Sequence, residues 1–331
     1  MPRAYSARMC SASARWDRAL LDDLVLSRGT IDRTAALRHD AAWLTEASVS
    51  PDSRVMFVHE GRCAVMAPST QAAEITVALA PAADVLSPTA LTLLGVDVDG
   101  TPHFVQHCAA VEDLGELAAS VEWASLRDIA HRLDDAQAGL AVAAVALDNW
   151  RRATRWCASC GDPLQVTAAG WAQHCPTESI DHFPRTEPAV IVLIRDRADR
   201  ALLGRQASWQ STWFSTFAGF VEAGESAEAA LRREVLEETG VLIDGDPDAI
   251  VYLGSQPWPF PASLMLGYHA WTSNPDVTVD GTEIVEARWF TRDELLQACE
   301  SGSVHLPPAV SISRKLIERW YGEPLPGHWL R

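Results

Sequence analysis

Two stretches in the first half of the chain show paired apolar runs separated by a turn signal. Residues 56–67 place apolar residues on both sides of Glu60-Gly61, and residues 91–107 do so around Asp99-Gly100. An acidic residue followed by glycine, between two apolar runs, is typical of the tight turn that joins neighbouring antiparallel strands. The pattern therefore predicts two β-hairpins in this half of the chain.

Helical patterns follow the two hairpins. Residues 117–133 and 136–154 are rich in alanine and leucine, which favour helices. No internal repeat and no chemical motif occurs in this half. We therefore expect residues 1–154 to form a mixed α/β domain that supports the rest of the protein.

The last 145 or so residues alternate predicted strands and helices, roughly the size of one ordinary domain. Short apolar or alternating runs predict strands at 188–196, 200–206, 250–255, 264–272 and 287–291. Helix formers predict helices at 226–239, 292–299 and 308–322. Strands flanked by helices at this spacing indicate a layered α/β domain over residues 187–331.

The chemistry of the chain centres on the predicted helix at 226–239. Glu234, Glu237 and Glu238 stand at positions i, i+3 and i+4, so their carboxylates project from one face. Three like charges at this spacing destabilise a helix unless a cation neutralises them. Oxygen ligands alone suit Mg²⁺ or Mn²⁺, which favour substrates that carry phosphates. The apolar positions expected to face a core are Leu231, Val235 and Leu236.

This helix belongs to a longer pattern with two interpretations. The simpler one is a solvated acidic helix in which Arg233 pairs with a neighbour. However, the stretch GFVEAGESAEAALRREVLEETGV at 219–241 specifies nine positions of one known motif, the Nudix box, which it resembles without a departure. Nudix enzymes hydrolyse nucleoside diphosphates linked to another group. The resemblance therefore implies this activity and the α/β/α sandwich of Nudix domains.

The resemblance also implies roles for individual residues. Glu234, Glu237 and Glu238 are implied to bind the metal ions and to act in catalysis, with Glu238 the most critical. Glu225 and Arg233 are implied to brace the loop and helix rather than to touch substrate. The remaining implied metal ligands are the backbone carbonyl of Ala218 and the carboxylate of Glu283.

A second motif, SQPWPFPAS at residues 255–263, has a proline at every second position of its centre. Alternate prolines keep a segment extended and stiff, and in an extended chain Trp258 and Phe260 point to the same side. Two aromatic rings on a rigid strip offer a platform for flat rings such as adenine or nicotinamide. The alternative is a proline-rich loop packed on the core.

Together the two motifs resemble the NADH pyrophosphatase subfamily, which includes enzymes that remove NAD caps from RNA. The resemblance covers residues 155–331 and is weaker over residues 1–150. It implies hydrolysis of NAD(H) to nicotinamide mononucleotide and AMP, and an N-terminal domain that supports a homodimer. The residues implied to contact the substrate are Gln256, Pro257, Trp258, Pro259, Phe260, Pro261, Ala262, Ser263, Phe183 and Ser313.

Residues 155–186 form a short insert that carries three cysteines. Cys157 and Cys160 stand on a turn closed by glycine, as in a zinc knuckle, and Cys175 follows at the distance expected of a second pair. A fourth cysteine is absent, because residue 178 is glutamate. The candidates to complete a zinc site are Glu178, Asp181, His174 and His182. A ribbon without zinc and a redox pair are the alternatives.

Composition narrows the function further. The net charge of −17 disfavours loose electrostatic binding to nucleic acid, including DNA. No apolar run reaches the length of a membrane span, and residues 1–20 lack the apolar core of a secretion signal. Seven cysteines without such a signal favour reduced thiols, so we expect a cytoplasmic protein.

The sequence thus predicts an N-terminal mixed α/β domain (1–154), a zinc-ribbon-like insert (155–186) and a Nudix α/β/α sandwich (187–331). The expected activity is hydrolysis of NAD(H), and of NAD-capped RNA, with Mg²⁺ or Mn²⁺. One alternative is a Nudix hydrolase of ADP-ribose or diadenosine polyphosphates, against which SQPWPFP weighs. Another is a non-catalytic regulator that senses NAD, against which the complete set of box glutamates weighs.

Overall fold

The computed structural model describes residues 20–66, 75–85 and 91–329. The chain forms two compact units. One comprises Val25–Thr186 and Pro257–Ser263, and the other comprises Glu187–Gln256, the chain from Leu264 onward and the segment that ends at Leu24. The N-terminal residues 1–19, where no secretion signal is predicted, lie outside the described part. No helix among the described residues has the length and apolar character needed to cross a membrane.

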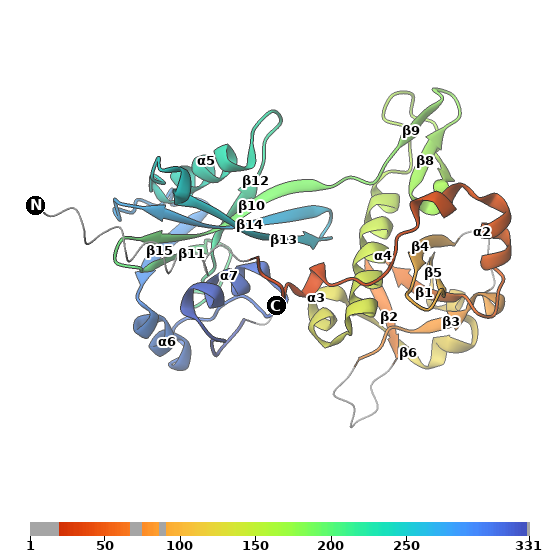
Figure 1. Cartoon of the computed structure of the whole chain (residues 1–331), viewed down its shortest axis with the longest axis horizontal. Helices are drawn as coiled ribbons and strands as arrows, with labels where there is room; N and C mark the ends of the chain where they lie inside the picture. Colours follow the sequence, from red (N-terminus) through yellow and green to blue (C-terminus); the bar gives the residue numbers. More distant parts are fainter. Residues whose placement is uncertain (1–19, 67–74, 86–90, 330–331) are drawn as a thin grey trace, which may run out of the picture. The chain divides into compact units, whose positions relative to one another are not determined.

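A six-stranded sheet forms the framework of the N-terminal unit (Figure 1). Its strands are, in spatial order, β4 (Thr92–Val96), β5 (Pro102–His107), β1 (Arg54–His59), β2 (Arg62–Met66) and β6 (Val121–Ser125), with β3 (Leu79–Pro81) paired to β1. Both predicted hairpins are confirmed, as β1–β2 and β4–β5. Glu60 and Gly61 adopt φ of 48° and 73°, the left-handed geometry that a two-residue hairpin turn requires.

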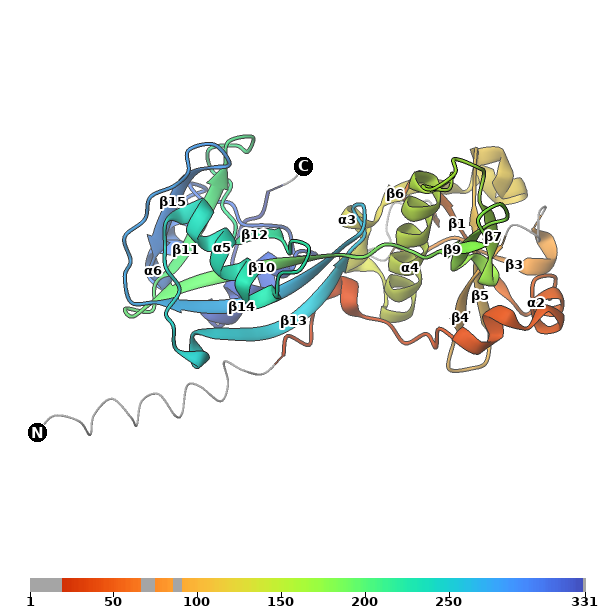
Figure 2. The ribbon, with the colours of Figure 1, turned by 90° about the horizontal axis from the view of Figure 1, so that it is seen from above.

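The long helix α4 (Asp135–Ala153) packs on this sheet and confirms the second predicted helix (Figure 2). The helix predicted at 117–133 is wrong. The chain there forms β6, which pairs with β2, followed by the single-turn helix α3 (Leu126–Ile129) and the 3₁₀ turn η6 (Ala130–Arg132). Val121 and Trp123 are strong strand formers, and pairing with an open sheet edge outweighs the helix propensity of the neighbouring alanines.

Shorter elements complete the unit. They are α2 (Ala41–Ala47) and the 3₁₀ turns η1 (Val25–Ser27), η2 (Ala35–His39), η3 (Ala82–Asp84), η5 (Val111–Ala119), η6 (Ala130–Arg132) and η7 (Ala168–Gly170). The cysteine-bearing insert forms its own antiparallel sheet of β7 (Gln165–Thr167), β8 (Ala172–Cys175) and β9 (Ile180–His182). The predicted ribbon-like segment is therefore a small three-stranded sheet.

A second mixed sheet forms the middle layer of the C-terminal unit. Its spatial order is β13 (Ile250–Trp258), β14 (Ser263–Thr272), β10 (Glu187–Asp196), β11 (Ala201–Gln206) and β15 (Ile284–Phe290), with β12 (Phe217–Phe220) paired to β10. The helices are α5 (Ala227–Thr239), α6 (Arg292–Glu300) and α7 (Ile312–Tyr321), and η8 (Pro247–Ala249) precedes β13. Each strand predicted in this half is present.

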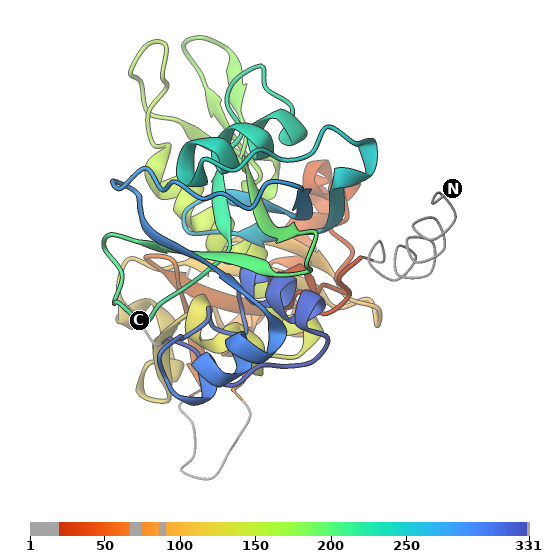
Figure 3. The same ribbon diagram turned by 90° about the vertical axis from the view of Figure 1, so that its left-hand side faces the viewer.

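Helices cover both faces of this sheet, because the central strand β10 is apolar on both sides. Val190 and Val192 belong to the cluster that includes α5, whereas Ile191 and Leu193 belong to the cluster that includes α6 and α7. Figure 3 shows α5 in teal and the C-terminal helices in blue on opposite sides of the strands. The predicted α/β/α sandwich is confirmed.

Two details of the predicted helices are corrected. α7 begins at Ile312 rather than at Pro308, because Ser311 caps it by accepting a hydrogen bond from the backbone N–H of Ser313. On α5, Leu231 and Val235 are buried as expected, but Leu236 is 45% exposed. The helix meets the sheet along a narrow stripe, and position 236 lies outside it.

Candidate active site

The loop and helix that carry the glutamates are fixed at both ends of α5. Ser226 caps the N-terminus by accepting from the N–H of Ala229, and Gly240 ends the helix in the left-handed conformation with φ of 69°. Before the helix, Gly219 of β12 faces the Glu234 carboxyl. A Cβ at this glycine would lie 1.9 Å from the carboxyl carbon of Glu234. Glycine is therefore required there for Glu234 to approach the strand.

The C-terminal cap of α5 gives a first testable prediction. Gly240→Ala should lower the free energy of unfolding by about 1–2 kcal/mol, the cost of a left-handed L-residue. A Cβ there would also lie 3.1 Å from the carbonyl oxygen of Thr278. The matched control is Gly245→Ala, where no atom lies within 4 Å of the added methyl. Urea unfolding of both variants measures the difference, and equal midpoints would contradict the assigned role of this cap.

Arg233 holds three of the surrounding carboxylates. Its guanidinium contacts Glu225 at 2.8 Å, Glu234 at 2.8 Å and Glu237 at 3.0 Å, and it donates to the carbonyl of Phe220 at 3.0 Å. The hydrogen bonds that Arg233 donates to Glu225, and then to Glu234, raise the pKa of this arginine. The arginine therefore offsets part of the repulsion between the glutamates and ties the helix to the preceding loop. This geometry supports the bracing role expected of Glu225 and Arg233.

The three box glutamates occupy different environments although they share one helix. The Glu237 side chain is 59% exposed, the Glu234 side chain is 17% exposed, and Glu238 is 4% exposed. Burial raises the pKa of Glu238 to about 9. The neighbouring carboxylates that add to this rise are those of Glu283, Glu234, Asp280 and Glu237.

Glu283 reaches this group from a loop outside the box. The loop is held by Asp280, whose carboxylate accepts from the backbone N–H groups of Glu283 at 2.8 Å and Ile284 at 2.8 Å. A second hydrogen bond connects this loop to the end of β11, because the N–H of Ala207 donates to the Glu283 carbonyl at 3.2 Å. Sequence reasoning missed Asp280; the Asp280-Gly281 turn signal ahead of β15 could have identified it.

These residues fit a divalent metal ion. The Oε2 atom of Glu238 is buried and has no hydrogen-bond partner among the described residues. A buried, unpartnered carboxylate oxygen beside several other carboxylates is costly unless a cation accepts their charge. Ala218 lies on β12 opposite Ile191, one residue before Gly219. The use of its carbonyl as a metal ligand stays a prediction.

The predicted aromatic platform has a different shape from the expected one. The segment is not one extended strip, because β13 ends at Trp258, residues 259–262 form a turn and β14 begins at Ser263. The N–H of Phe260 donates to the carbonyl of Trp258 at 2.7 Å, which closes the turn. The two rings lie 5.1 Å apart at 81°, edge to face rather than side by side. Proline suits turns as well as extended chain, and the hairpin must reverse direction here.

Two residues that sequence reasoning missed hold this turn. The guanidinium of Arg127 lies 4.3 Å from the centre of the Phe260 ring and 5.4 Å from that of Trp258. Asn149 of α4 donates to the carbonyl of Pro259 at 2.7 Å. Arg127 occupies a single-turn helix within the stretch predicted as a long helix, so the sequence pattern carried no signal for its position. A cation over two rings adds positive charge beside the platform.

Three further predicted substrate contacts lie in distinct surroundings. Gln256 is fully buried and donates to the carbonyl of Val310 at 2.9 Å. Ser313 is 1% exposed, and its hydroxyl bonds to those of Ser215 and Thr216, each at 2.8 Å. Phe183 is 67% exposed, as a ring available for stacking would be. Substrate contact by these residues stays a prediction, as it does for the rest of the 256–263 segment.

The three cysteines of the insert come together as predicted. The sulfur atoms of Cys157, Cys160 and Cys175 all lie within 4.8 Å of one another, and those of Cys160 and Cys175 are 3.5 Å apart. Backbone hydrogen bonding from Cys160 is the main cause that lowers the pKa of Cys157 to about 6, and Ser159, His182 and Cys175 add to it. A cluster of this composition could bind a metal ion.

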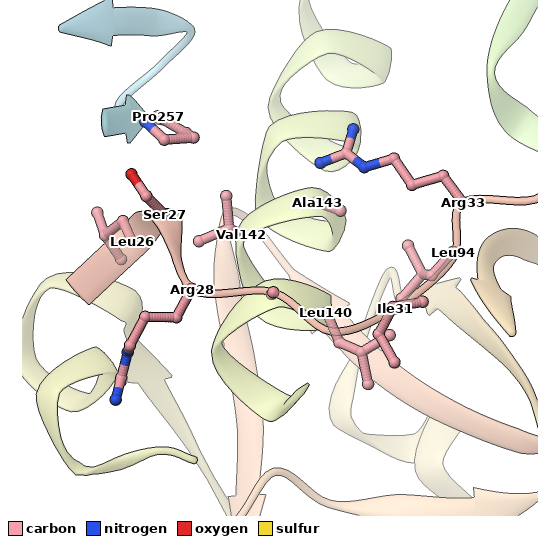
Figure 4. Close-up of a pocket in the computed structure, with 12 residues that line it drawn as sticks. Leu26, Ser27, Arg28, Ile31, Arg33, Leu94, Leu140, Val142, Ala143 and Pro257 are labelled. Carbon is pink, nitrogen blue, oxygen red and sulfur yellow. The ribbon is translucent and has the colours of Figure 1, made fainter. Parts of the chain in front are cut away.

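A cavity of about 190 Å³ lies beside α4 in the N-terminal unit (Figure 4). Its walls include Leu140, Val142 and Ala143 of the helix, together with Pro257. Arg28 points away from this space, and its guanidinium donates to the carbonyls of Ala130 and Leu133. Because no described residue that lines the cavity is a histidine, a cysteine or an acidic residue, we assign the cavity no catalytic role.

Comparisons with known proteins agree with this geometry. The family described as "NUDIX domain" matches residues 185–319, and the "NADH pyrophosphatase-like rudimentary NUDIX domain" matches residues 44–150. The protein named NAD-capped RNA hydrolase NudC in Mycobacterium bovis (strain BCG / Pasteur 1173P2) is 39% identical over 312 residues. That alignment covers 89% of this chain and 94% of the relative. The chain therefore belongs to the Nudix family.

Further relatives bear the same name. The NudC of Mycobacterium tuberculosis (strain ATCC 25618 / H37Rv) is 38% identical, with 89% of this chain and 94% of that protein covered. The NudC of Stutzerimonas stutzeri (strain A1501) is 37% identical over 232 residues, with 69% of this chain and 78% of that protein covered. The likeness extends over both units, including the N-terminal unit, where the sequence motifs alone were weak.

Proposed function

We propose that this protein is a metal-dependent NAD(H) diphosphatase that releases nicotinamide mononucleotide and AMP, and that it also removes NAD caps from RNA. The observation that carries the proposal is the buried Glu238, whose unpartnered oxygen lies among the carboxylates of Glu234 and Glu283. The aromatic turn at Trp258 and Phe260 would supply a site for flat rings. The names of the relatives, NAD-capped RNA hydrolase, support the same substrate class.

The chain's own residues would divide the work. The groups that would hold divalent ions are Glu234, Glu237, Glu238, Glu283 and the carbonyl of Ala218. Bound Mg²⁺ or Mn²⁺ offsets charge on phosphate oxygens and lowers the pKa of water. Glu238 would accept a proton from the attacking water, since it is the buried carboxylate. Arg233 keeps Glu234 and Glu237 oriented, so little reorganisation is needed when substrate arrives.

The aromatic turn would bind one ring of the dinucleotide and so orient the pyrophosphate. Stacking on Trp258 is sequence-tolerant, because every base offers a π-face. The adjacent Arg127 guanidinium adds a positive charge that suits a phosphate-bearing substrate. Binding energy from the ring is then used to position the scissile bond.

Incubation of the purified protein with NADH and Mn²⁺ tests the proposal. We expect AMP and nicotinamide mononucleotide in equal amounts, and their loss when the metal is chelated. Equal or greater turnover of ADP-ribose or a diadenosine polyphosphate would favour a broader Nudix hydrolase. Binding of NAD without any release of AMP would favour a non-catalytic sensor. RNA with a 5′ NAD cap, assayed in parallel, shows whether the same site removes the cap.

The remaining parts of the proposal concern the cysteine insert and the assembly. We propose that Cys157, Cys160 and Cys175 bind zinc, which thiolates on a tight turn favour. We further propose a cytoplasmic homodimer, as the resemblance to NADH pyrophosphatases implies. Light scattering of the purified chain measures the oligomeric state, and a monomeric mass at assay concentrations would contradict the dimer.

A further inference from the structure

The three-cysteine cluster lacks a fourth ligand. Zinc held by thiolates at 2.3 Å with tetrahedral angles separates the sulfur atoms by about 3.8 Å. The 3.5 Å between the sulfurs of Cys160 and Cys175 is close to that separation and far too long for a disulfide. Three thiolates leave one corner of the tetrahedron open, and structural zinc sites are usually closed by a fourth protein ligand.

Four residues were candidates for the fourth zinc ligand, and the register of β8 and β9 excludes two of them, His174 and Asp181. Residues directly opposite in an antiparallel pair point to the same face, and faces alternate along each strand. Cys175 is therefore on the face opposite to that of His174, which pairs with Asp181 across the sheet. The Nδ1 atom of His174 contacts the Asp181 carboxylate at 2.8 Å on the exposed side. Both side chains are engaged away from the sulfur atoms.

The same register directs His182 toward the cysteines. His182 lies opposite Gln173, and these two share a face with Cys175. The Gln173 side chain donates to the carbonyl of Thr154 at 2.7 Å, so this face is covered by the segment that leads into Cys157. The His182 side chain is one of the groups that lower the pKa of the Cys157 thiol, and its Nε2 atom is buried without a hydrogen-bond partner among the described residues.

Glu178 occupies the position where a fourth cysteine would stand, but its side chain is turned outward. The residue is exposed, and its backbone N–H, rather than its carboxylate, contacts Cys175 at 3.4 Å from the sulfur. An N–H donated to the sulfur stabilises a thiolate without occupying a coordination position. Glu178 thus acts as a turn residue beside the cluster.

We propose that His182 is the fourth ligand, so that the insert binds zinc through Cys157, Cys160, Cys175 and His182. This inference rests on the proposed zinc site and is independent of the hydrolase activity. The three sulfur atoms form the cluster without the imidazole, so the His182 side chain would have to turn toward them to take the corner that Glu178 leaves open. The site would thereby be closed although residue 178 is glutamate rather than cysteine.

Metal analysis of the full-length chain tests the assignment. We expect one zinc per chain in the wild type. His182→Ala should weaken zinc binding at least 100-fold in competition with a chelator, a loss at or beyond the upper end seen for outer-shell changes. The matched controls are His174→Ala and Glu178→Ala, which should bind zinc as the wild type does. His182→Cys should restore tight binding, which separates a lost ligand from a misfolded insert.

Cobalt substitution supplies a second readout that is independent of NADH hydrolysis. Co²⁺ in the wild type should show thiolate charge-transfer bands and the intense visible bands of a tetrahedral site, and His182→Ala should weaken the visible bands. Loss of zinc in Glu178→Ala with retention in His182→Ala would overturn the assignment. A wild type that hydrolyses NADH but holds no zinc would overturn the zinc site and leave the proposed function intact.

Discussion

Glu238→Gln should lower kcat for NADH by roughly 10²–10⁴-fold, the range attributed to a positioned general base. The substitution keeps the size of the side chain and removes its charge, so a proton acceptor and metal ligand is lost without a cavity. Because Glu238 is 4% exposed among other carboxylates, the neutral side chain should not destabilise the fold. Steady-state kinetics at saturating NADH and Mn²⁺ measure the loss.

The control for this variant lies on the same helix. Glu228 is exposed in the first turn of α5, so Glu228→Gln removes an equal charge away from the site and should leave kcat unchanged. Mn²⁺ should raise the melting temperature of the wild type and of Glu228→Gln, because a ligand bound to the native state stabilises it. The rise should be smaller for Glu238→Gln. Wild-type turnover in that variant would show that the site has been misassigned.

Much of this site could be predicted from sequence because its parts are local. The i, i+3, i+4 spacing places the three glutamates on one helix, and Gly219 and Gly240 mark where the loop and helix begin and end. The bracing contacts of Arg233 also lie within the same 23-residue stretch. Short-range rules apply to such a segment, so the sequence pattern and the observed geometry agree.

Contacts between distant segments could not be predicted in the same way. The approach of Asp280 to Glu238 depends on where β15 enters the sheet, and the position of Arg127 depends on β6 replacing the predicted helix. The difference in burial between Glu237 and Glu238 likewise depends on how α5 rests on the sheet. In each case a contact between segments distant in the sequence, rather than local propensity, decides the outcome.

The aromatic turn shows a third reason why the sequence did not predict the whole site. The sequence identifies the residue types, because alternate prolines and two aromatics are visible in SQPWPFPAS. It does not identify the direction of the chain, because proline is compatible with both an extended strip and a turn. The observed turn places Trp258 and Phe260 edge to face beneath Arg127. A ligand ring would therefore stack on one of the two aromatics rather than lie across both.

This geometry leads to the second prediction with a large effect on activity, which concerns Trp258. Stacking of a base on an aromatic side chain contributes about 1–3 kcal/mol. Trp258→Ala should therefore reduce kcat/KM for NADH by roughly 5- to 150-fold, since about 1.36 kcal/mol corresponds to a tenfold change. Hydrolysis should persist at a lower rate, because the glutamates are untouched. Trp258→Phe keeps a ring in place and should recover most of the loss.

In the competing interpretation Trp258 is a packing residue, because its side chain is partly buried and its ring centre lies 5.1 Å from that of Phe260. Truncation would then lower the melting temperature and reduce the hydrolysis of every substrate alike. A diribosyl pyrophosphate that lacks both bases distinguishes the two, because it has no ring to stack. We expect Trp258→Ala to slow this compound much less than NADH. Equal losses for both substrates, together with a large fall in melting temperature, would exclude the stacking role.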